Sequence, residues 1–277
     1  MKVQISHLTR YRYEYPVRSI LQMLRLMPGN SDGQHAVAWR IEPSIDGCLR
    51  RTEDPLGNIV HVFSAEGPVN ELSLRVSGEV LTTDTGGVVR GFAESVPEAY
   101  FLRDTPLTQA DGAIRTFAQS LAGENSEGGD RLTLLHRLLA AIHRHMRFDA
   151  SRTDVATSAA HAFALGEGVC QDLSHIFLAA ARYLEIPSRY VSGYFVRNDG
   201  IVHQDAGHAW VEAFVPGLGW VGFDPANGIC PTDAHVRVAI GLDYLNAAPI
   251  RGSRRGGGAE TLDVRLKVAS APRQVQS

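Results

Sequence analysis

The stretch "GEGVCQDLSHIF", residues 166–177, carries a single cysteine directly after a glycine-rich turn. The apolar residues that follow recur at helical spacing: Leu173, Ile176, Phe177, Ala180 and Leu184. This spacing predicts a helix that begins at Cys170 and ends before Pro187. Free N–H groups and the helix dipole favour a thiolate at such a position, and Gly166 and Gly168 let a substrate approach it. On its own, a cysteine with these flanks is more often structural than reactive.

A histidine and an aspartate follow in "GHAWVEAFVPGLGWVGFDP", residues 207–225. His208 opens one strand of alternating pattern, and Asp224 closes the next strand after the turn "PGLG". A cysteine, a histidine and an aspartate supply a nucleophile, a general base and a group that orients the base. These three residue types in this order therefore indicate thiol catalysis by Cys170.

The register of this hairpin decides whether the histidine and the aspartate can meet. If the five residues from Val215 to Gly219 form the loop, Phe214 pairs with Trp220. His208 then lies diagonally across from Asp224 on one face, about 7 Å away, which is close enough for the carboxylate to reach an imidazole N–H. A two-residue loop would instead place the two side chains on opposite faces.

Other polar residues near the cysteine have simpler interpretations. Asp172 lies in the first turn of the predicted helix, where we expect it to cap the free N–H groups. His175 falls on a different helical face from the cysteine, so we expect it to be packed or hydrogen-bonded. A metal cluster of His203, Asp205 and His208 is an alternative, but this stretch has a loop pattern and lacks rigid elements that converge on an ion. No metal or other cofactor is therefore expected.

The composition excludes several classes of protein. The 277 residues are 44% hydrophobic and 21% charged, which is typical of a soluble globular protein. A formal net charge of −3 argues against nucleic acid or an anionic membrane as the main partner. No run approaches the ~20 apolar residues of a membrane helix, and the N-terminal residues lack a signal-peptide pattern. Three dispersed cysteines form no disulfide framework, so we expect a cytoplasmic protein.

The pattern of apolar residues divides the chain into two domains. Residues 1–97 alternate with period two, as in "YRYEY" and "LSLRVSGEVL", and glycine-rich turns lie between these runs. This predicts a β-sandwich-like domain. Residues 98–277 begin with helical patterns and continue with strands, which predicts an α+β domain with helices packed on an antiparallel sheet.

Three details of the second domain are also predicted. We expect a helix over residues 105–123, capped by Thr105 or Thr108. The run "RGSRR", residues 251–255, is expected to be a solvated loop at a glycine-rich hairpin tip. The last strands, through "TLDVRLKVA" at residues 261–269, are expected to extend the sheet of this domain.

These segments together resemble a known family. "GEGVCQDLSHIFLAAARYLEIPSRYVSGYF" and "GHAWVEAFVPGLGWVGFDP" resemble the transglutaminase-like core, a papain-related fold with a Cys-His-Asp triad. "HLTRYRYEYPV", "LRLMPGN" and "DPLGN" are similar to the N-terminal β domain of bacterial transglutaminase-like proteins, a group often described as cysteine proteases. The resemblance implies Cys170 as nucleophile, His208 as base and Asp224 as the third member.

The expected function is thiol-dependent hydrolysis of an amide bond in a peptide or another amide substrate. The reaction would pass through a thioester on Cys170, and water would release the acyl group. Two alternatives remain open. In one, an amine accepts the acyl group, as in a transglutaminase, and in the other the fold is a non-catalytic binding module.

Overall fold

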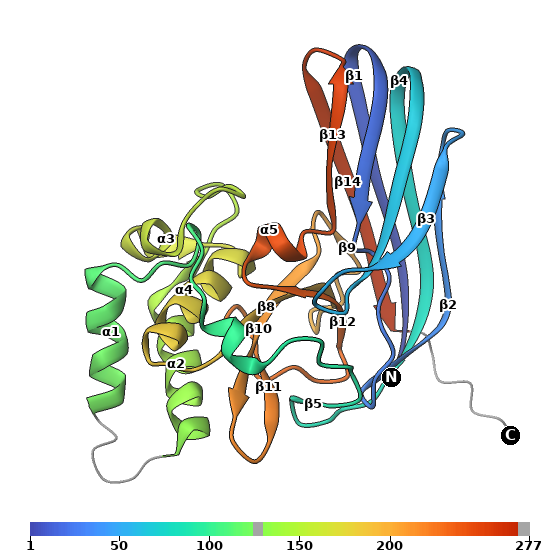
Figure 1. Ribbon diagram of the computed structural model, residues 1–277. Coiled ribbons are helices and arrows are strands. Elements are labelled where there is room, and N and C mark those ends of the chain that lie inside the picture. The colour runs from blue at the N-terminus through green and yellow to red at the C-terminus, as the bar shows by residue number, and fades with distance from the viewer. Residues whose placement is uncertain (124–129, 271–277) are drawn as a thin grey trace, which may run out of the picture.

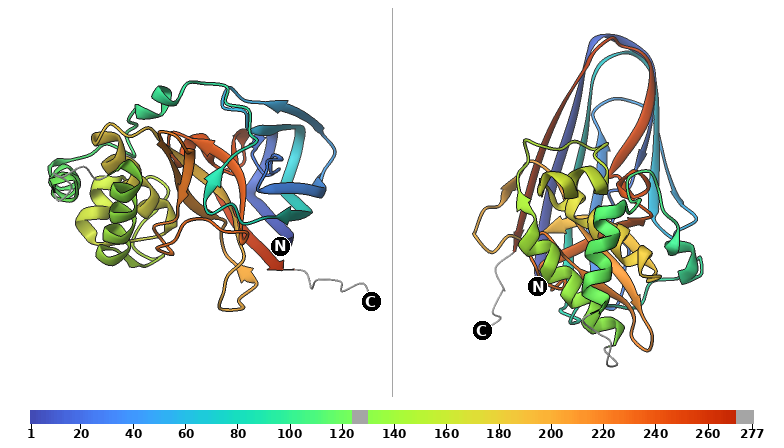
Figure 2. Two further views of the ribbon diagram at one scale, coloured as in Figure 1. Left: turned by 90° about the horizontal axis from the view of Figure 1, so that it is seen from below. Right: turned by 90° about the vertical axis from the view of Figure 1, so that its left-hand side faces the viewer.

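The computed structural model describes residues 1–123 and 130–270. Figure 1 shows a tall β-sheet built from both ends of the chain, a smaller sheet beside it and a group of helices. Seen from below in Figure 2, the smaller sheet lies between the helices and the tall sheet. In the described part of the chain, no helix is long and apolar enough to cross a membrane.

The tall sheet is antiparallel and has seven strands in the order β2-β4-β1-β14-β9, with β3 paired to β4 and β13 paired to β1. The strands of this sheet are β1 (Lys2–Leu24), β2 (Gln34–Pro43), β3 (Cys48–Glu53), β4 (Ile59–Thr82), β9 (His203–Gln204), β13 (Ile250–Gly256) and β14 (Glu260–Ser270).

The long strands β1 and β4 fold this sheet over into two layers. Their pairing register shifts between Arg12 and Val17, where both strands bend at the top of the molecule (Figure 1). Buried side chains from both halves of each strand share one cluster, which includes Tyr11, Ile20, Phe63 and Leu74. Since the inward-facing residues of two packed layers form one core, the arrangement agrees with the sandwich-like domain predicted from period-two alternation.

The smaller sheet has five antiparallel strands in the order β12-β8-β10-β11-β5. Its strands are β5 (Val88–Val89), β8 (Ser188–Phe195), β10 (His208–Val215), β11 (Gly219–Phe223) and β12 (His235–Gly241). A separate parallel pair consists of β6 (Arg147–Phe148) and β7 (Glu167–Gly168). The expected α+β class is therefore confirmed.

The helices gather on the outer side of the smaller sheet (Figure 1). They are α1 (Gly112–Gly123), α2 (Arg131–His145), α3 (Ala159–Leu165) and α4 (Cys170–Tyr183). The 3-10 helix η1 (Glu98–Leu102) and the short α5 (Tyr244–Ala247) lie apart from this group, where η1 contacts β8 and α5 contacts β8 and β12. Side-chain caps define two of the starts: Asp130 accepts the Thr133 N–H at 2.7 Å, and Ser158 accepts the His161 N–H at 3.3 Å.

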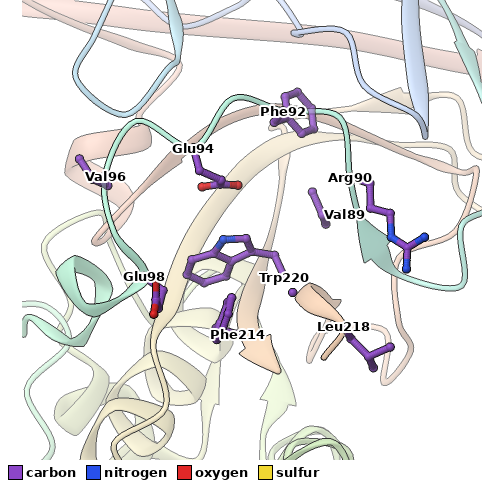
Figure 3. A pocket seen from close by; sticks show the side chains of 10 residues that line it. Val89, Arg90, Phe92, Glu94, Val96, Glu98, Phe214, Leu218 and Trp220 are labelled. Carbon is purple, nitrogen blue, oxygen red and sulfur yellow. The ribbon is translucent and has the colours of Figure 1, made fainter. Parts of the chain in front are cut away.

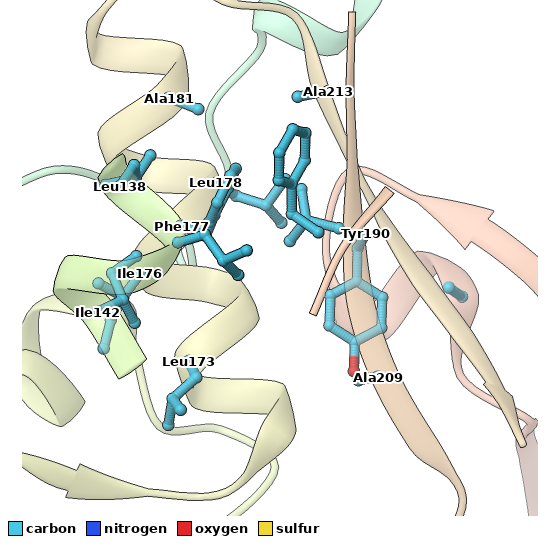
Figure 4. Close-up of a cluster of buried hydrophobic side chains, with 14 of the residues drawn as sticks. Leu138, Ile142, Leu173, Ile176, Phe177, Leu178, Ala181, Tyr190, Ala209 and Ala213 are labelled. Carbon is cyan, nitrogen blue, oxygen red and sulfur yellow. The ribbon is translucent and has the colours of Figure 1, made fainter. Parts of the chain in front are cut away.

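Helix α4 is the centre of this domain. Every residue from Gln171 to Arg182 is buried, because the helix packs between α2 and strands β8 and β10 (Figure 4). Its apolar residues Leu173, Ile176 and Phe177 lie in the same cluster as Tyr190 of β8. Burial of each such side chain contributes about 1.5–3 kcal/mol, so the position of the helix, and of its first residue, is strongly defined.

The last strands do not extend the smaller sheet, so that prediction is wrong. Strand β14 pairs with β1 from Val3↔Ser270 to Tyr13↔Glu260, and "RGSRR" lies in β13, which pairs with the second half of β1. A strand in which apolar and polar residues alternate can pair with the edge of either sheet, and the sequence does not show which edge is free. The domain boundary near residue 97 stays a prediction, and residues 271–277 lie outside the described part.

The start of α1 also differs from the prediction. The helix begins at Gly112, and Asp111 caps it by accepting the Ile114 N–H at 2.9 Å. Thr108 is fully buried, and its hydroxyl accepts a hydrogen bond from Arg182 at 2.8 Å. The Thr105 hydroxyl lies 3.0 Å from that of Thr108, so both hydroxyls are engaged away from the helix start and neither threonine is the cap.

Candidate active site

Cys170 is the first residue of α4, as the sequence predicts. Helix α3 ends at Leu165, and Gly166 adopts a left-handed conformation (φ 69°) that turns the chain into β7. Pairing of β7 with β6 holds this segment through the Arg147 N–H to Gly166 carbonyl bond at 2.9 Å. The thiol is half-buried and packs against the main hydrophobic cluster.

Asp172 caps the start of this helix, which confirms the capping interpretation. Its Oδ2 atom accepts the Val169 N–H at 2.8 Å and the Thr153 hydroxyl at 2.7 Å. Burial outweighs these hydrogen bonds and raises the pKa of the Asp172 carboxyl. A Cβ atom on Gly168 would lie only 2.7 Å from the same oxygen. The role of Gly168 is therefore to make room for the cap.

The β10–β11 hairpin has the register that brings His208 and Asp224 together. Phe214 pairs with Trp220, and pairing continues to Val215↔Gly219, so the loop is three residues long rather than five. Loops of three and of five residues give the same pairing of Phe214 with Trp220, so His208 and Asp224 lie on the same face of the hairpin, as predicted. The Nε2 atom of His208 lies 2.6 Å from Oδ2 of Asp224.

The charges of the site favour a protonated His208. Burial disfavours the imidazolium, but the charge and hydrogen bond of Asp224, with those of Cys170, outweigh it and raise the pKa of His208 to about 10. Burial also works against the Asp224 carboxylate, yet its interactions with His208 and His235 hold its pKa well below the usual range. Since Nε2 of His208 faces Asp224, the other ring nitrogen, Nδ1, is left for Cys170.

Asp224 is fully buried and is held by donors that the sequence analysis missed. Its Oδ1 accepts the backbone N–H groups of Ala226 at 3.1 Å and Asn227 at 3.2 Å. Its Oδ2 accepts the Asn227 side-chain amide at 2.7 Å and His235 Nε2 at 3.1 Å. The signal "DPAN" directly after β11 is typical of a turn and could have suggested the first three contacts, whereas nothing local to His235 indicates the fourth.

Aromatic rings surround the imidazole of His208. Phe195 lies 5.1 Å from it between ring centroids, and Trp210 lies 6.0 Å away. Trp210 is 2% exposed, so its ring is part of the buried wall of the site. Such apolar neighbours exclude water and strengthen the interactions among the charged groups.

The remaining candidates lie apart from this cluster. His203 is exposed in β9, and Asp205 is exposed in the loop that follows. His175 is fully buried, and its Nε2 accepts the Tyr244 N–H at 3.1 Å, so it is hydrogen-bonded as expected. His143 supports the loop after Asp224 through a 3.1 Å contact with the Pro225 carbonyl.

A metal cluster of His203, Asp205 and His208 does not form. Among the described residues, the group that could hold an ion is His208, Asp224 and His235. Two ligands of a tetrahedral zinc ion at ~2.0–2.1 Å lie roughly 3.4 Å apart. The 2.6 Å separation of His208 Nε2 and Asp224 Oδ2 is shorter and fits a hydrogen bond.

A cavity of about 320 Å³ lies elsewhere, where η1 and β5 meet the far end of the β10–β11 hairpin. Glu94, Glu98, Phe214 and Trp220 are among its lining residues (Figure 3). Phe214 is six residues along β10 from His208, which corresponds to roughly 20 Å. This cavity is therefore separate from the candidate active site.

A half-buried thiol on a helix N-terminus, an imidazole and a buried carboxylate form the candidate site of this α+β fold. The comparisons with known proteins agree. Residues 115–225 match the transglutaminase-like superfamily, and residues 3–81 match the bacterial transglutaminase-like N-terminal region. The chain therefore carries a transglutaminase-like core preceded by the bacterial transglutaminase-like N-terminal region.

Individual relatives extend this assignment. The fold is similar to that of a candidate cysteine protease from Cytophaga hutchinsonii, with a TM-score of 0.77, 19% identity, and coverage of 100% of this chain and 92% of that one. The uncharacterized protein ML0607 of Mycobacterium leprae is 28% identical and covers 96% of this chain and 98% of its own. A protein-glutamine gamma-glutamyltransferase of Pseudomonas aeruginosa is 32% identical over 113 residues, which are 36% of this chain and 16% of that protein. Together these findings support a cysteine-dependent enzyme.

Proposed function

We propose that this protein hydrolyses amide bonds through a thioester on Cys170. The observation that carries the proposal is the chain of contacts from Cys170 through His208 to the buried Asp224. A raised His208 pKa favours an imidazolium beside Cys170, and a neighbouring imidazolium is the kind of group that stabilises a thiolate nucleophile. The expected substrate is a peptide or another amide.

The proposed reaction has two steps. The Cys170 thiolate attacks the carbonyl carbon, and as the C–N bond breaks, His208 gives its proton to the leaving amine. A thioester remains. Water then attacks the thioester while His208 takes a proton from the water. The C–S bond breaks, the carboxylic acid is released, and the Cys170 thiolate beside the His208 imidazolium is regenerated. Backbone N–H groups at the start of α4 are suited to stabilise the oxyanion that develops in both steps.

Transfer of the acyl group to an amine is the second candidate. The local likeness of the core to the Pseudomonas glutamyltransferase favours it. The same residues would perform it, with a primary amine in place of water in the second step. We favour hydrolysis because water is always available.

The test offers the protein a glutamine-containing protein such as casein, with and without millimolar dansylcadaverine, and analyses the products by mass spectrometry. Hydrolysis predicts new peptide termini or free glutamates, and these products should disappear in Cys170→Ala and His208→Asn. Predominant dansylcadaverine adducts would establish the transferase instead.

A non-catalytic module is separated from both enzymes by alkylation. If the protein is an enzyme, iodoacetamide at pH 6–7 should modify Cys170 much faster than the other two cysteines. Cys48 is an exposed thiol, and burial raises the pKa of the Cys230 thiol. The variant His208→Asn should slow the modification of Cys170 alone. Equal, slow reaction at all three cysteines would contradict both enzymatic proposals.

A further inference from the structure

A second imidazole contacts the same carboxylate oxygen as His208. His235 is the first residue of β12 and pairs with Phe195 of β8. Its Nε2 atom lies 3.1 Å from Oδ2 of Asp224, the oxygen that also binds His208. Asp224 thus lies between two histidine rings whose centroids are 5.9 Å apart.

The backbone determines which nitrogen of His235 carries the proton. The Thr232 N–H donates to Nδ1 of His235 at 3.1 Å, so this nitrogen is an acceptor. In a neutral imidazole the proton is then on Nε2, which donates it to Asp224. A second proton on the ring would break the bond to Thr232, so His235 is suited to remain a neutral donor.

Packing leaves the ring little freedom to do anything else. His235 is 6% exposed, with Phe195 at 4.6 Å and Trp210 at 5.3 Å between ring centroids, the latter edge-on. A buried ring that served only to fill space would not need a polar atom directed at a carboxylate, and burial of an unpaired imidazole is costly. The ring and its hydrogen bond to Thr232 therefore hold one N–H at a defined position beside Asp224.

We propose that His235 is a positioning residue, which holds the Asp224 carboxylate in the orientation that His208 requires. This inference rests on the proposed function of the Cys170 site. Asn227 and the backbone of Ala226 hold Asp224 from the loop that follows it, while His235 holds it from β12, on the other side of β8 from β10. Two independent elements thereby prevent rotation of the carboxylate away from His208.

Two substitutions separate this role from packing. His235→Phe keeps an aromatic ring between Phe195 and Trp210 but removes the N–H. His235→Gln loses the ring but retains an amide N–H that can reach Asp224. Loss of a hydrogen bond to a charged group corresponds to about a ten- to hundredfold effect. We expect His235→Phe to slow both amide turnover and the alkylation of Cys170 by this factor, with KM little changed, and His235→Gln to recover most of the loss.

A spectroscopic measurement on the wild-type protein completes the test. In histidine-labelled protein, ¹⁵N NMR should show His235 as the neutral Nε2–H form from pH 6 to 9. Thermal unfolding of both variants controls for misfolding.

The proposal is overturned if His235→Phe alkylates at the wild-type rate, if His235→Gln is no better than His235→Phe, or if the ring is in the Nδ1–H form. Alkylation and NMR need no substrate. Absence of amide turnover with a normal His235 signal would therefore contradict the proposed function and not this inference.

Discussion

The imidazole of His208 and the carboxylate of Asp224 share a 2.6 Å hydrogen bond across a hairpin, although they are sixteen residues apart in the chain. One begins strand β10 and the other directly follows strand β11, so both lie at the same end of the sheet. The first residue of α4 reaches this end as well. The three groups are therefore positioned by the ends of regular elements, which are more rigid than long loops.

The first prediction concerns the pH dependence of Asp224→Asn. The wild-type carboxylate outweighs the effect of burial and raises the pKa of His208 to about 10. Without that charge, burial dominates, and the imidazolium loses its proton at a lower pH. We expect kcat/KM to fall at least about a hundredfold and its alkaline limb to move to lower pH. An unchanged alkaline limb in a pH profile of amide turnover would contradict this assignment of His208.

Two glycines on either side of the turn before Cys170 predict different consequences. A Cβ on Gly168 would meet Asp172 Oδ2 at 2.7 Å, whereas nothing lies within 4 Å of one on Gly166. Gly168→Ala should therefore displace the cap and lower activity tenfold or more.

The matched variant Gly166→Ala places alanine at φ 69°, which costs about 1 kcal/mol of stability and about 2–4 °C in melting temperature. It should retain near-wild-type activity per folded molecule. Equal activity of the two variants would show that the cap does not position Cys170.

The third prediction concerns a buried charge network on the smaller sheet. Glu212 is fully buried and binds Arg189 at 2.6 Å and Arg237 at 2.7 Å, while Arg189 also binds Glu94 at 2.7 Å. Glu212→Gln leaves the fully buried Arg189 and the largely buried Arg237 with one carboxylate, that of Glu94. Removal of one member of such a group costs about 3–5 kcal/mol.

Chemical denaturation should reveal this loss. The control is Glu42→Gln, which removes the exposed ion pair with Arg40 and should have little effect. A similar small change in both variants would mean that the network contributes nothing to stability.

The fourth prediction concerns the contact between the two sheets at His7. This residue is 5% exposed, and its ring nitrogens contact the hydroxyls of Tyr194 and Thr9, both at 3.1 Å. Burial lowers the pKa of His7 to about 4. The folded protein therefore binds a proton there less readily than the unfolded chain, so stability is lost as the pH falls from about 6.5 toward 4.

Between about pH 6.5 and pH 4, protonation of His7 in the unfolded chain lowers the free energy of unfolding by up to about 1.4 kcal/mol per pH unit. Denaturation at pH 7.5 and pH 5 should show a smaller difference in the free energy of unfolding for His7→Gln than for wild type. The exposed His35→Gln should keep the wild-type difference. A His7→Gln variant with the full wild-type difference would contradict the prediction.

Much of the candidate site follows from local patterns. The apolar spacing after Cys170 indicates where α4 begins, and the alternation in β10 and β11 predicts a hairpin whose parity allows His208 to meet Asp224. These features depend on residues close together in the chain, whose side-chain directions are set by the geometry of a helix or a strand. The loop length was wrong by two residues without consequence, because only its parity matters.

Only the tertiary structure decided which distant segments meet. Strand β14 pairs with β1 and not with the smaller sheet, and His235 reaches Asp224 although its own segment carries no signal for it. A strand of alternating apolar and polar residues can join any sheet that has a free edge. Which edge is free is decided only when the other strands have paired. The sequence therefore determined the three groups proposed for catalysis and the elements that carry them. The fold determined what surrounds and holds the carboxylate, because those contacts come from packing between segments far apart in the chain.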